Sequence, residues 1–172
     1  RVLRKKDIIL ISGSMTNLLD TYKDKRVLIT GHTGFKGSWL SIWLNKLGAQ
    51  VAGFSLSPYT SDDNYVVTGI ENEIKSYIGD LRDFESLSTV FKEFRPEIVF
   101  HLAAQTLVLE SYSDPKYTFD TNVGGLVNLL EACNNCDSVR TIVVVTSDKC
   151  YDNKEWLWGY RENDPMGGVD PY

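Results

Sequence analysis

The sequence predicts an α/β fold, a doubly wound parallel sheet with helices on both faces. Five short apolar runs, each typical of a buried strand, alternate with segments whose apolar residues recur at helical spacing. A glycine-rich turn joins the first run directly to the first helical segment. Small and polar residues follow several of the runs, at the sheet edge where open α/β sheets bind their ligands.

Composition limits the classes of protein to consider. With 172 residues, 42% of them hydrophobic, the chain can bury one substantial core, so one domain is expected. Its net charge of -5, with one short basic cluster at residues 4–6, argues against nucleic acid as a main partner. Its apolar runs are far shorter than the roughly 20 residues of a membrane span, so no membrane partner is expected.

Residues 1–14 fit the predicted fold poorly. They combine a basic start with a short apolar patch at residues 8–11, and the patch is too short for a secretory signal. We expect them to be a leader or upstream sequence, with Met15 as the natural start. The predicted cofactor-binding domain then occupies residues 15–172 and lacks its carboxyl-terminal substrate part.

The first strand, residues 25–29, leads into three glycines at equal spacing, Gly31, Gly34 and Gly37. Glycines here permit a tight turn and bring the backbone close to a pyrophosphate, while the following helix offers free N–H groups. This strand–turn–helix context favours a dinucleotide site of the Rossmann type over a merely structural turn. Gly48 is predicted to end this helix, whose apolar residues recur at helical spacing: Trp39, Leu40, Trp43, Leu44 and Leu47.

The second strand, residues 50–54, ends in serines, with neither the acidic residue that holds the ribose of NAD nor the arginine typical of NADP sites. These residues alone therefore leave the choice of cofactor open. The third strand, residues 74–78, is followed by Asp80, which could accept a hydrogen bond from an adenine amino group. Alternatively, Asp80 shapes the turn and Asp83 caps the helix over residues 84–94.

The fourth strand, residues 97–102, contains His101, which we interpret as a core histidine rather than a catalytic one. Asp114 and the proline after it begin a predicted long helix. Two glycines inside this helix indicate a close neighbouring backbone. The predicted buried stripe of the helix is Phe119, Val123, Leu126, Val127, Leu130 and Cys133.

Three cysteines and no secretory signal favour reduced thiols in the cytoplasm. Cys133 and Cys136 have C-x-x-C spacing, but without a second cysteine pair we expect helix-end packing and no metal site.

The fifth strand, residues 141–145, is almost entirely β-branched and is predicted to be central in the sheet. It delivers Ser147, Asp148 and Lys149 to the ligand-binding edge. A hydroxyl, an acid and an amine side by side could move protons on a substrate bound beside a nicotinamide cofactor. The alternative is a polar turn without chemistry.

Six runs of residues carry a specific resemblance: 26–40, 101–105, 121–123, 146–151, 158–168 and 170–172. They resemble the extended short-chain dehydrogenase/reductase family, and within it the CDP-glucose 4,6-dehydratases. The Thr-Ser-Asp-Lys run at residues 146–149 is particularly specific, because related dehydratases usually have Thr-Asp-Glu there. The resemblance covers residues 15–172.

The resemblance implies an internal redox cycle in which NAD oxidises C4 of the sugar, water leaves across C5 and C6, and the hydride returns to C6. It implies that Tyr172 is the base for the C4 hydroxyl and that Ser147 assists it. Asp148 would protonate the leaving C6 hydroxyl, and Lys149 would handle the C5 proton. The implied cofactor contacts are Gly31, Gly34, Phe35, Lys36, Gly37, Asp80, Leu81, Ala103, Ala104 and Thr121. CDP-glucose is the implied substrate, and the full-length protein is expected to form homo-oligomers through the helix that begins at Asp114.

Two departures from the family pattern reduce the expected activity. The lysine that follows the tyrosine by four residues in the family lies beyond Tyr172, the last residue of this sequence, and Leu109 stands where the family usually has arginine. We therefore expect this polypeptide alone to have little or no turnover. Two alternatives remain: a dehydratase or epimerase for another nucleotide sugar, and a non-catalytic dinucleotide-binding module.

Overall fold

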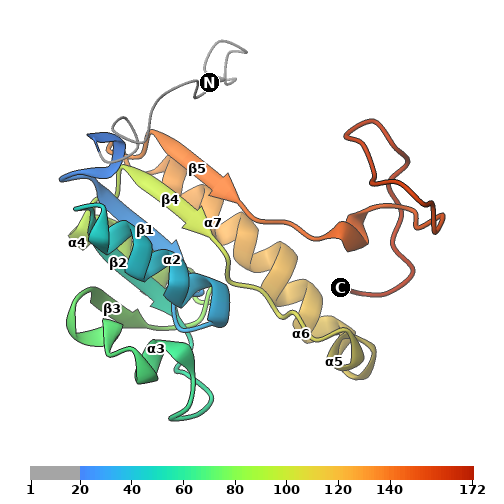
Figure 1. The fold of residues 1–172 in the computed structure, drawn as a ribbon, viewed down its shortest axis with the longest axis horizontal. Helices are drawn as coiled ribbons and strands as arrows, with labels where there is room; N and C mark the ends of the chain where they lie inside the picture. Colours follow the sequence, from blue (N-terminus) through green and yellow to red (C-terminus); the bar gives the residue numbers. More distant parts are fainter. Residues whose placement is uncertain (1–19) are drawn as a thin grey trace.

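The structure, a computed structural model, describes residues 20–172, so the predicted leader at residues 1–14 lies outside the described residues. The described residues form a five-stranded parallel sheet of order β3-β2-β1-β4-β5 (Figure 1). Its strands are β1 (Arg26–Thr30), β2 (Gln50–Ser55), β3 (Lys75–Ile78), β4 (Ile98–His101) and β5 (Thr141–Val144). The predicted doubly wound parallel fold is therefore confirmed.

The direction of winding reverses at β1. Val27 of β1 aligns with Val51 of β2 on one side and with Ile98 of β4 on the other. In a doubly wound sheet, loops after the two strands at such a reversal diverge and leave a crevice at their carboxyl ends. The glycine turn follows β1, so the fold places it at this point.

Helices cover both faces of the sheet (Figure 1). One face packs against α2 (Phe35–Lys46), with Val27, Ile29 and Leu44 in its core. The other face packs against α4 (Phe84–Phe94) and α7 (Gly125–Asn134), with Leu28, Phe54, Leu87, Val99 and Leu129 in its core. The remaining helical segments are α3 (Asn64–Val67), η1 (Ile70–Asn72), α5 (Val108–Ser113), α6 (Pro115–Phe119), the π-helical turn η2 (Asp120–Gly124) and η3 (Asp148–Cys150). Among residues 20–172, no helix is long and apolar enough to cross a membrane.

The apolar residues at helical spacing in α2 face the core only in part: Leu44 is buried and Leu40 and Leu47 pack against the same core. Trp39 and Trp43 are 52% and 55% exposed, whereas the buried positions are Gly37, Ser38, Ser41 and Leu44. The reason is the close approach of the helix to the glycine turn, where a Cβ on Gly37 would lie 2.0 Å from the carbonyl oxygen of Gly31. Only small residues fit between them, so the tryptophans lie outside.

The predicted single helix from Asp114 is instead interrupted by the π-helical turn η2 between α6 and α7. Its predicted stripe is only partly right, because Cys133 is buried while Phe119, Val123 and Val127 are 55–60% exposed. The buried positions are Thr118 of α6 and Gly125, Leu129, Ala132 and Cys133 of α7. The predicted close neighbouring backbone is wrong for both glycines of this helix: a Cβ on Gly125 would lie 3.0 Å from Cβ of the Leu81 side chain, and a Cβ on Gly124 would meet nothing within 4 Å.

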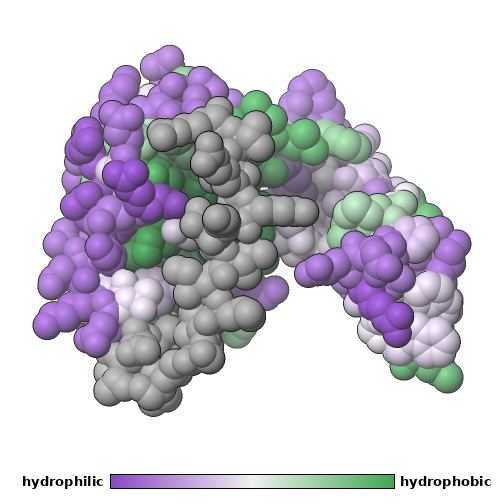
Figure 2. Space-filling model, turned by 90° about the horizontal axis from the view of Figure 1, so that it is seen from above, coloured by the Kyte–Doolittle hydropathy of each residue, from purple (hydrophilic) through white to green (hydrophobic). Residues whose placement is uncertain are grey.

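The prediction that the fifth strand is central is wrong within the described residues. There β5 pairs only with β4 and forms an edge of the sheet, and Ile142, Val143 and Val145 are 37–47% exposed. β-branched residues indicate that a segment is suited to form a strand. They do not determine whether the strand is central, because that depends on which other segments pair with it. Residues 147–172, which we call the carboxyl-terminal arm, extend beyond β5 and stand apart from the sheet as a separate lobe (Figure 1, Figure 2).

Candidate functional site

The glycine turn requires glycine for two independent reasons. Gly31 has a φ of 75°, a left-handed conformation that L side chains rarely adopt, and a Cβ there would lie 2.8 Å from the backbone nitrogen of Ala103. Its N–H donates to the carbonyl oxygen of Phe54 at 2.9 Å, and the N–H of Gly34 donates back to the Gly31 carbonyl oxygen at 3.1 Å. The turn therefore brings the ends of β1, β2 and β4 together.

The amino-terminal end of α2 is open to an anion. Its N-cap residue, Gly34, makes no side-chain capping bond within the described residues, and Gly34, Phe35 and Lys36 are exposed. The first N–H groups of a helix have no intrahelical partner and carry a partial positive charge. This end of the helix, beside the glycine turn, can accept a phosphate or pyrophosphate.

His32, inside the glycine turn, has a structural role that the sequence did not reveal. Its ring is buried, hydrogen-bonds through Nε2 to Oγ of Ser76 at 2.7 Å, and packs edge-on against Tyr65 with ring centroids 5.2 Å apart. Burial lowers the pKa of His32 from 6.5 to about 4, so the ring is neutral near pH 7. A Cβ on Gly53 would collide with this ring, so the glycine in β2 makes room for the histidine.

His101 is a buried core residue, as predicted. Its Nδ1 lies 2.7 Å from Oγ1 of Thr30, the same hydroxyl that accepts a hydrogen bond from the backbone N–H of Ala103 at 3.3 Å. Burial lowers the pKa of His101 from 6.5 to about 4. The histidine thus ties the end of β4 to the end of β1, where Ala103 and Ala104 were predicted to contact the cofactor.

A side-chain network in the π-helical turn holds the loop after β4. The amide of Asn122 accepts from the N–H of Gln105 at 2.7 Å and donates to the carbonyl oxygen of Gln105 at 3.0 Å. Gln105 in turn donates from Nε2 to Oγ1 of Thr118 at 3.1 Å. Neither Asn122 nor Gln105 was expected in the site from the sequence, because a side-chain amide carries no local signal of its partner.

Thr121, a predicted cofactor contact, lies in the same turn. Its Oγ1 is buried and has no hydrogen-bond partner among residues 20–172. Buried hydroxyls are normally hydrogen-bonded, so an orphaned one next to a candidate ligand site is compatible with a partner supplied by the ligand.

The structure shows Asp80 engaged in a different contact from the predicted one. Both of its carboxylate oxygens accept from Arg82, with Nη2–Oδ2 at 2.6 Å, and Arg82 also lies over the ring of Tyr117 at 4.7 Å. The hydrogen bond from Arg82 is the main cause that lowers the pKa of Asp80 below its usual value. Asp83 caps α4 by accepting from the N–H of Ser86 at 3.2 Å, as the alternative interpretation proposed.

A cavity of about 590 Å³ adjoins this turn. It is lined by Asp80, Arg82, Asp83, Asp120, Gly124 and Asn128. Leu81, a predicted cofactor contact, is buried and does not line this cavity, and its carbonyl oxygen accepts from Nδ2 of Asn128 at 2.8 Å.

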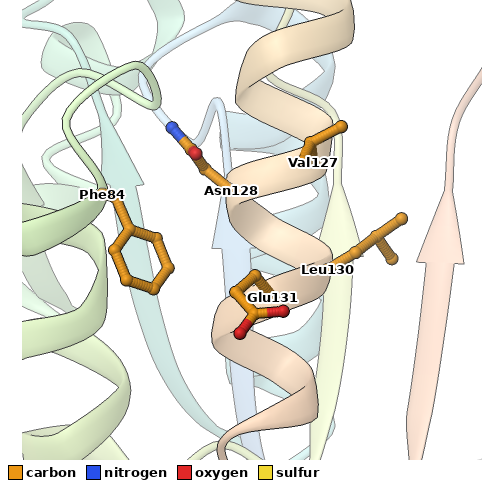
Figure 3. A pocket seen from close by; sticks show the side chains of 5 residues that line it. All are labelled: Phe84, Val127, Asn128, Leu130 and Glu131. Atoms are coloured by element: carbon orange, nitrogen blue, oxygen red, sulfur yellow. The ribbon is translucent and has the colours of Figure 1, made fainter.

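A second cavity, of about 610 Å³, lies between α4 and α7 and contains none of the predicted site residues. Figure 3 shows Phe84 of α4 facing Asn128 and Glu131 of α7, whereas Val127 and Leu130 point away from α4. This groove lies between helices and not at the glycine turn, so we do not assign the cofactor to it.

The end of β2 gives no new preference between NAD and NADP. Ser55 is buried, and its hydroxyl lies 2.5 Å from Oγ1 of Thr33, which also donates to the carbonyl oxygen of Leu56 at 2.9 Å. Ser55 therefore fastens the glycine turn and is occupied by that contact.

The predicted catalytic residues after β5 lie together at the base of the carboxyl-terminal arm. The hydroxyl of Ser147 accepts from the N–H of Lys149 at 3.1 Å and donates to Oδ1 of Asp148 at 3.3 Å. Lys149 Nζ lies 3.5 Å from Oδ2 of Asp170, two residues before Tyr172. Within residues 20–172, no hydrogen bond or ion pair links these residues to the glycine turn, so the structure shows two separate parts of a site.

An aromatic stack forms the outer part of the arm and was also absent from the predicted site. Tyr151 and Tyr160 stack with centroids 5.0 Å apart, and Trp156 lies 5.6 Å from Tyr160 and 5.8 Å from Trp158. Such stacks stabilise a segment that has little other core.

Known proteins match this chain in sequence and in structure. A sequence model described as GDP-mannose 4,6 dehydratase matches residues 28–172. The CDP-glucose 4,6-dehydratase of Salmonella typhimurium is 54% identical over 151 residues, which are 88% of this chain and 42% of that protein. This finding confirms the resemblance predicted from the sequence.

Two solved structures illustrate the structural similarity. An epimerase of Methanothermobacter thermautotrophicus has a TM-score of 0.79 and 31% identity, covering 91% of this chain and 45% of that one. The UDP-glucose 4-epimerase of Thermus thermophilus, solved as a complex with NAD, has a TM-score of 0.74 and 32% identity, covering 86% and 46%. The chain thus spans less than half the length of these relatives.

Proposed function

The chain belongs to the GDP-mannose 4,6 dehydratase family, and on this premise we propose that it forms the cofactor-binding part of an NAD-dependent nucleotide-sugar 4,6-dehydratase. The proposed reaction converts CDP-glucose to CDP-4-keto-6-deoxyglucose with loss of water. The observation that carries this proposal is the 54% identity to the Salmonella CDP-glucose 4,6-dehydratase. The Ser147-Asp148-Lys149 run at the carboxyl end of β5 supports it.

The proposed cofactor site combines the glycine turn with the loops after β3 and β4. Gly31, Gly34 and Gly37 let the backbone approach the pyrophosphate, and the first N–H groups of α2, at Phe35 and Lys36, can donate to it. The further proposed contacts are Asp80, Leu81, Ala103, Ala104 and Thr121. The orphaned hydroxyl of Thr121 fits a bound dinucleotide. The absence of a Cβ at Gly31 lets the backbone of Ala103, a proposed cofactor contact, lie directly against the turn. When bound, NAD supplies the chemistry of taking a hydride from C4 of the sugar and giving it to C6.

The protein side chains in this proposal move protons. Tyr172 takes the proton of the C4 hydroxyl, and Ser147 donates a hydrogen bond to the same oxygen. Lys149, in its neutral form, takes the C5 proton while Asp148 protonates the C6 hydroxyl, so the C6–O bond breaks and water leaves. Lys149 then returns its proton to C5. Tyr172 has gained one proton and Asp148 has lost one, and exchange with solvent restores both.

Nucleotide binding by this chain is the first test, because it needs no turnover. We expect calorimetry to detect NAD binding, and we expect Gly34→Asp to weaken it by at least about tenfold, since a carboxylate would occupy the pyrophosphate position. A Cβ at Gly34 meets only the Gly31 carbonyl oxygen, at 3.3 Å, so the fold should tolerate the change. NADP is titrated in parallel.

Gly159→Asp is the matched control, because it adds the same charge at a glycine with nothing within 4 Å of its Cβ. Equal loss of binding in both variants, or no NAD binding by the folded chain, would contradict the proposed cofactor site.

The substrate is tested in a longer polypeptide that continues this chain with the carboxyl-terminal part of the Salmonella relative. We expect CDP-glucose to give a product with a new C6 methyl signal in its proton NMR spectrum. Consumption of UDP-glucose or GDP-glucose instead would assign a different nucleotide sugar.

A further inference from the structure

The base of the carboxyl-terminal arm is closed by backbone contacts. The N–H of Gly167 donates to the carbonyl oxygen of Cys150, and the N–H of Asp152 donates to that of Pro165, both at 3.0 Å. Tyr151 and Met166 form an antiparallel bridge between these two bonds. This closure brings residues 150–152, which follow β5, next to residues 165–167, which lie close to Tyr172 in sequence. Residues 153–164 separate the two segments along the chain.

Asp170 crosses this base to reach Lys149. Its side chain is only 4% exposed, and its Oδ2 lies 3.5 Å from Nζ of Lys149. Among the ion pairs of residues 20–172, this carboxylate is the most buried; the next, Glu97, is 23% exposed. The neighbouring pair of Lys154 and Asp152 is shorter, at 2.6 Å, but both of its side chains are more than 40% exposed.

The burial of Asp170 is costly for the fold. Its second oxygen, Oδ1, is buried without a hydrogen-bond partner in the described chain. A buried carboxylate with one unpaired oxygen loses more hydration than a single ion pair returns. The backbone bonds close the arm independently of this ion pair.

We propose that Asp170 is a positioning residue that holds the Lys149 amino group in place relative to Ser147, Asp148 and Tyr172. The proposal rests on the proposed dehydration. Lys149 is a long, flexible side chain that is 46% exposed, so without a partner it would sample many positions. Its charged form is also the state that follows uptake of the C5 proton, and a carboxylate partner stabilises Lys149 at that stage.

The ion pair is tested on the chain itself by trace acetylation of amino groups followed by mass spectrometry. We expect Asp170→Asn to raise the labelling rate of Lys149 by about three- to fivefold while Lys154 stays unchanged. Asp152→Asn, the matched control, should raise the rate at Lys154 and leave Lys149 unchanged. Asp170→Glu should restore most of the protection of Lys149.

Two outcomes would overturn this part of the proposal. One is an unchanged labelling rate of Lys149 in Asp170→Asn. The other is an equal rise at Lys149 and Lys154 that Asp170→Glu does not reverse, because this would mean that the arm had simply opened. Neither outcome depends on cofactor or substrate, so failure here is distinguishable from failure of the proposed dehydration.

The catalytic consequence is tested in the longer polypeptide described above. If Lys149 is misplaced, oxidation at C4 still occurs but elimination slows, so Asp170→Asn should accumulate the near-ultraviolet absorbance of reduced nicotinamide. We expect kcat to fall by about tenfold with little change in KM. Tyr172→Phe should prevent this absorbance, because it blocks the earlier step. Normal kcat without accumulation in Asp170→Asn would contradict the positioning role.

Discussion

At the scale of single residues, two buried histidines make the free energy of unfolding depend on pH. His32 and His101 both have a pKa lowered by burial from 6.5 to about 4. Between these values the unfolded chain binds more protons than the folded one, so the free energy of unfolding rises as pH increases from about 4 to about 6.5. Above that range the contribution is complete, and it reaches up to about 3 kcal/mol for each histidine.

We therefore expect denaturant unfolding to show a steep loss of stability as pH falls from 6.5 to 4. Carboxylates that the fold stabilises in their charged form, such as Asp80, add to the loss toward the acidic end. His101→Gln keeps a hydrogen-bonding group for Thr30 but cannot titrate, so it should remove about half of the histidine contribution. An unchanged pH slope in this variant would show that His101 does not cause it.

At the scale of elements, the interrupted helix is the part that organises the loop after β4. The π-helical turn directs Asn122 toward both backbone groups of Gln105. π-helical turns inside helices often occur at functional sites, because the extra residue re-aims a side chain. Here the re-aimed amide fixes the backbone that continues from Ala103 and Ala104, the proposed cofactor contacts.

Asn122→Ala should leave the N–H and carbonyl oxygen of Gln105 without these bonds. We expect a loss of about 2 kcal/mol in unfolding free energy and faster hydrogen exchange at Gln105. NAD binding should weaken several-fold through the loosened loop. Asn135→Ala is the control, because the side chain of Asn135 donates to exposed Glu131 at the end of α7, away from the loop after β4. Equal effects of the two variants on NAD binding would contradict the role of Asn122 in holding the loop after β4.

At the scale of the whole molecule, the described chain leaves a large apolar surface uncovered. Phe119, Val123, Val127 and Leu130 lie along one side of the interrupted helix and are 44–60% exposed. Figure 2 also shows hydrophobic residues reaching the surface in several places. Surfaces of this kind usually pack against another segment or another chain.

We expect the purified chain to self-associate as its concentration rises, measured by analytical ultracentrifugation. Val127→Lys should shift the equilibrium toward monomer, because it places a charge in the middle of this surface. Val67→Lys, at a valine of α3 that is 69% exposed, is the matched control. Identical association of both variants and the wild type would exclude the helix side as the contact.

The order of elements and the location of the glycine turn followed from the sequence. Strand periodicity, helix spacing and the glycines at 31, 34 and 37 are local patterns, and local patterns predict local structure. The sequence alone also indicated that residues 146–151 and 158–172 resemble one group of dehydratases. The 54% identity to a member of that group supports this resemblance.

Tertiary structure decided which side of each helix is buried, which strand forms the edge, and which polar groups meet. The side chain of Trp39 is exposed because Gly37 on the same helix must approach Gly31 closely. The spacing of apolar residues does not predict how closely two backbone segments approach each other. Likewise, Asn122 with Gln105 and Lys149 with Asp170 are contacts between segments that are distant along the chain. Composition limits which residues can be buried, but only the folded geometry selects their partners.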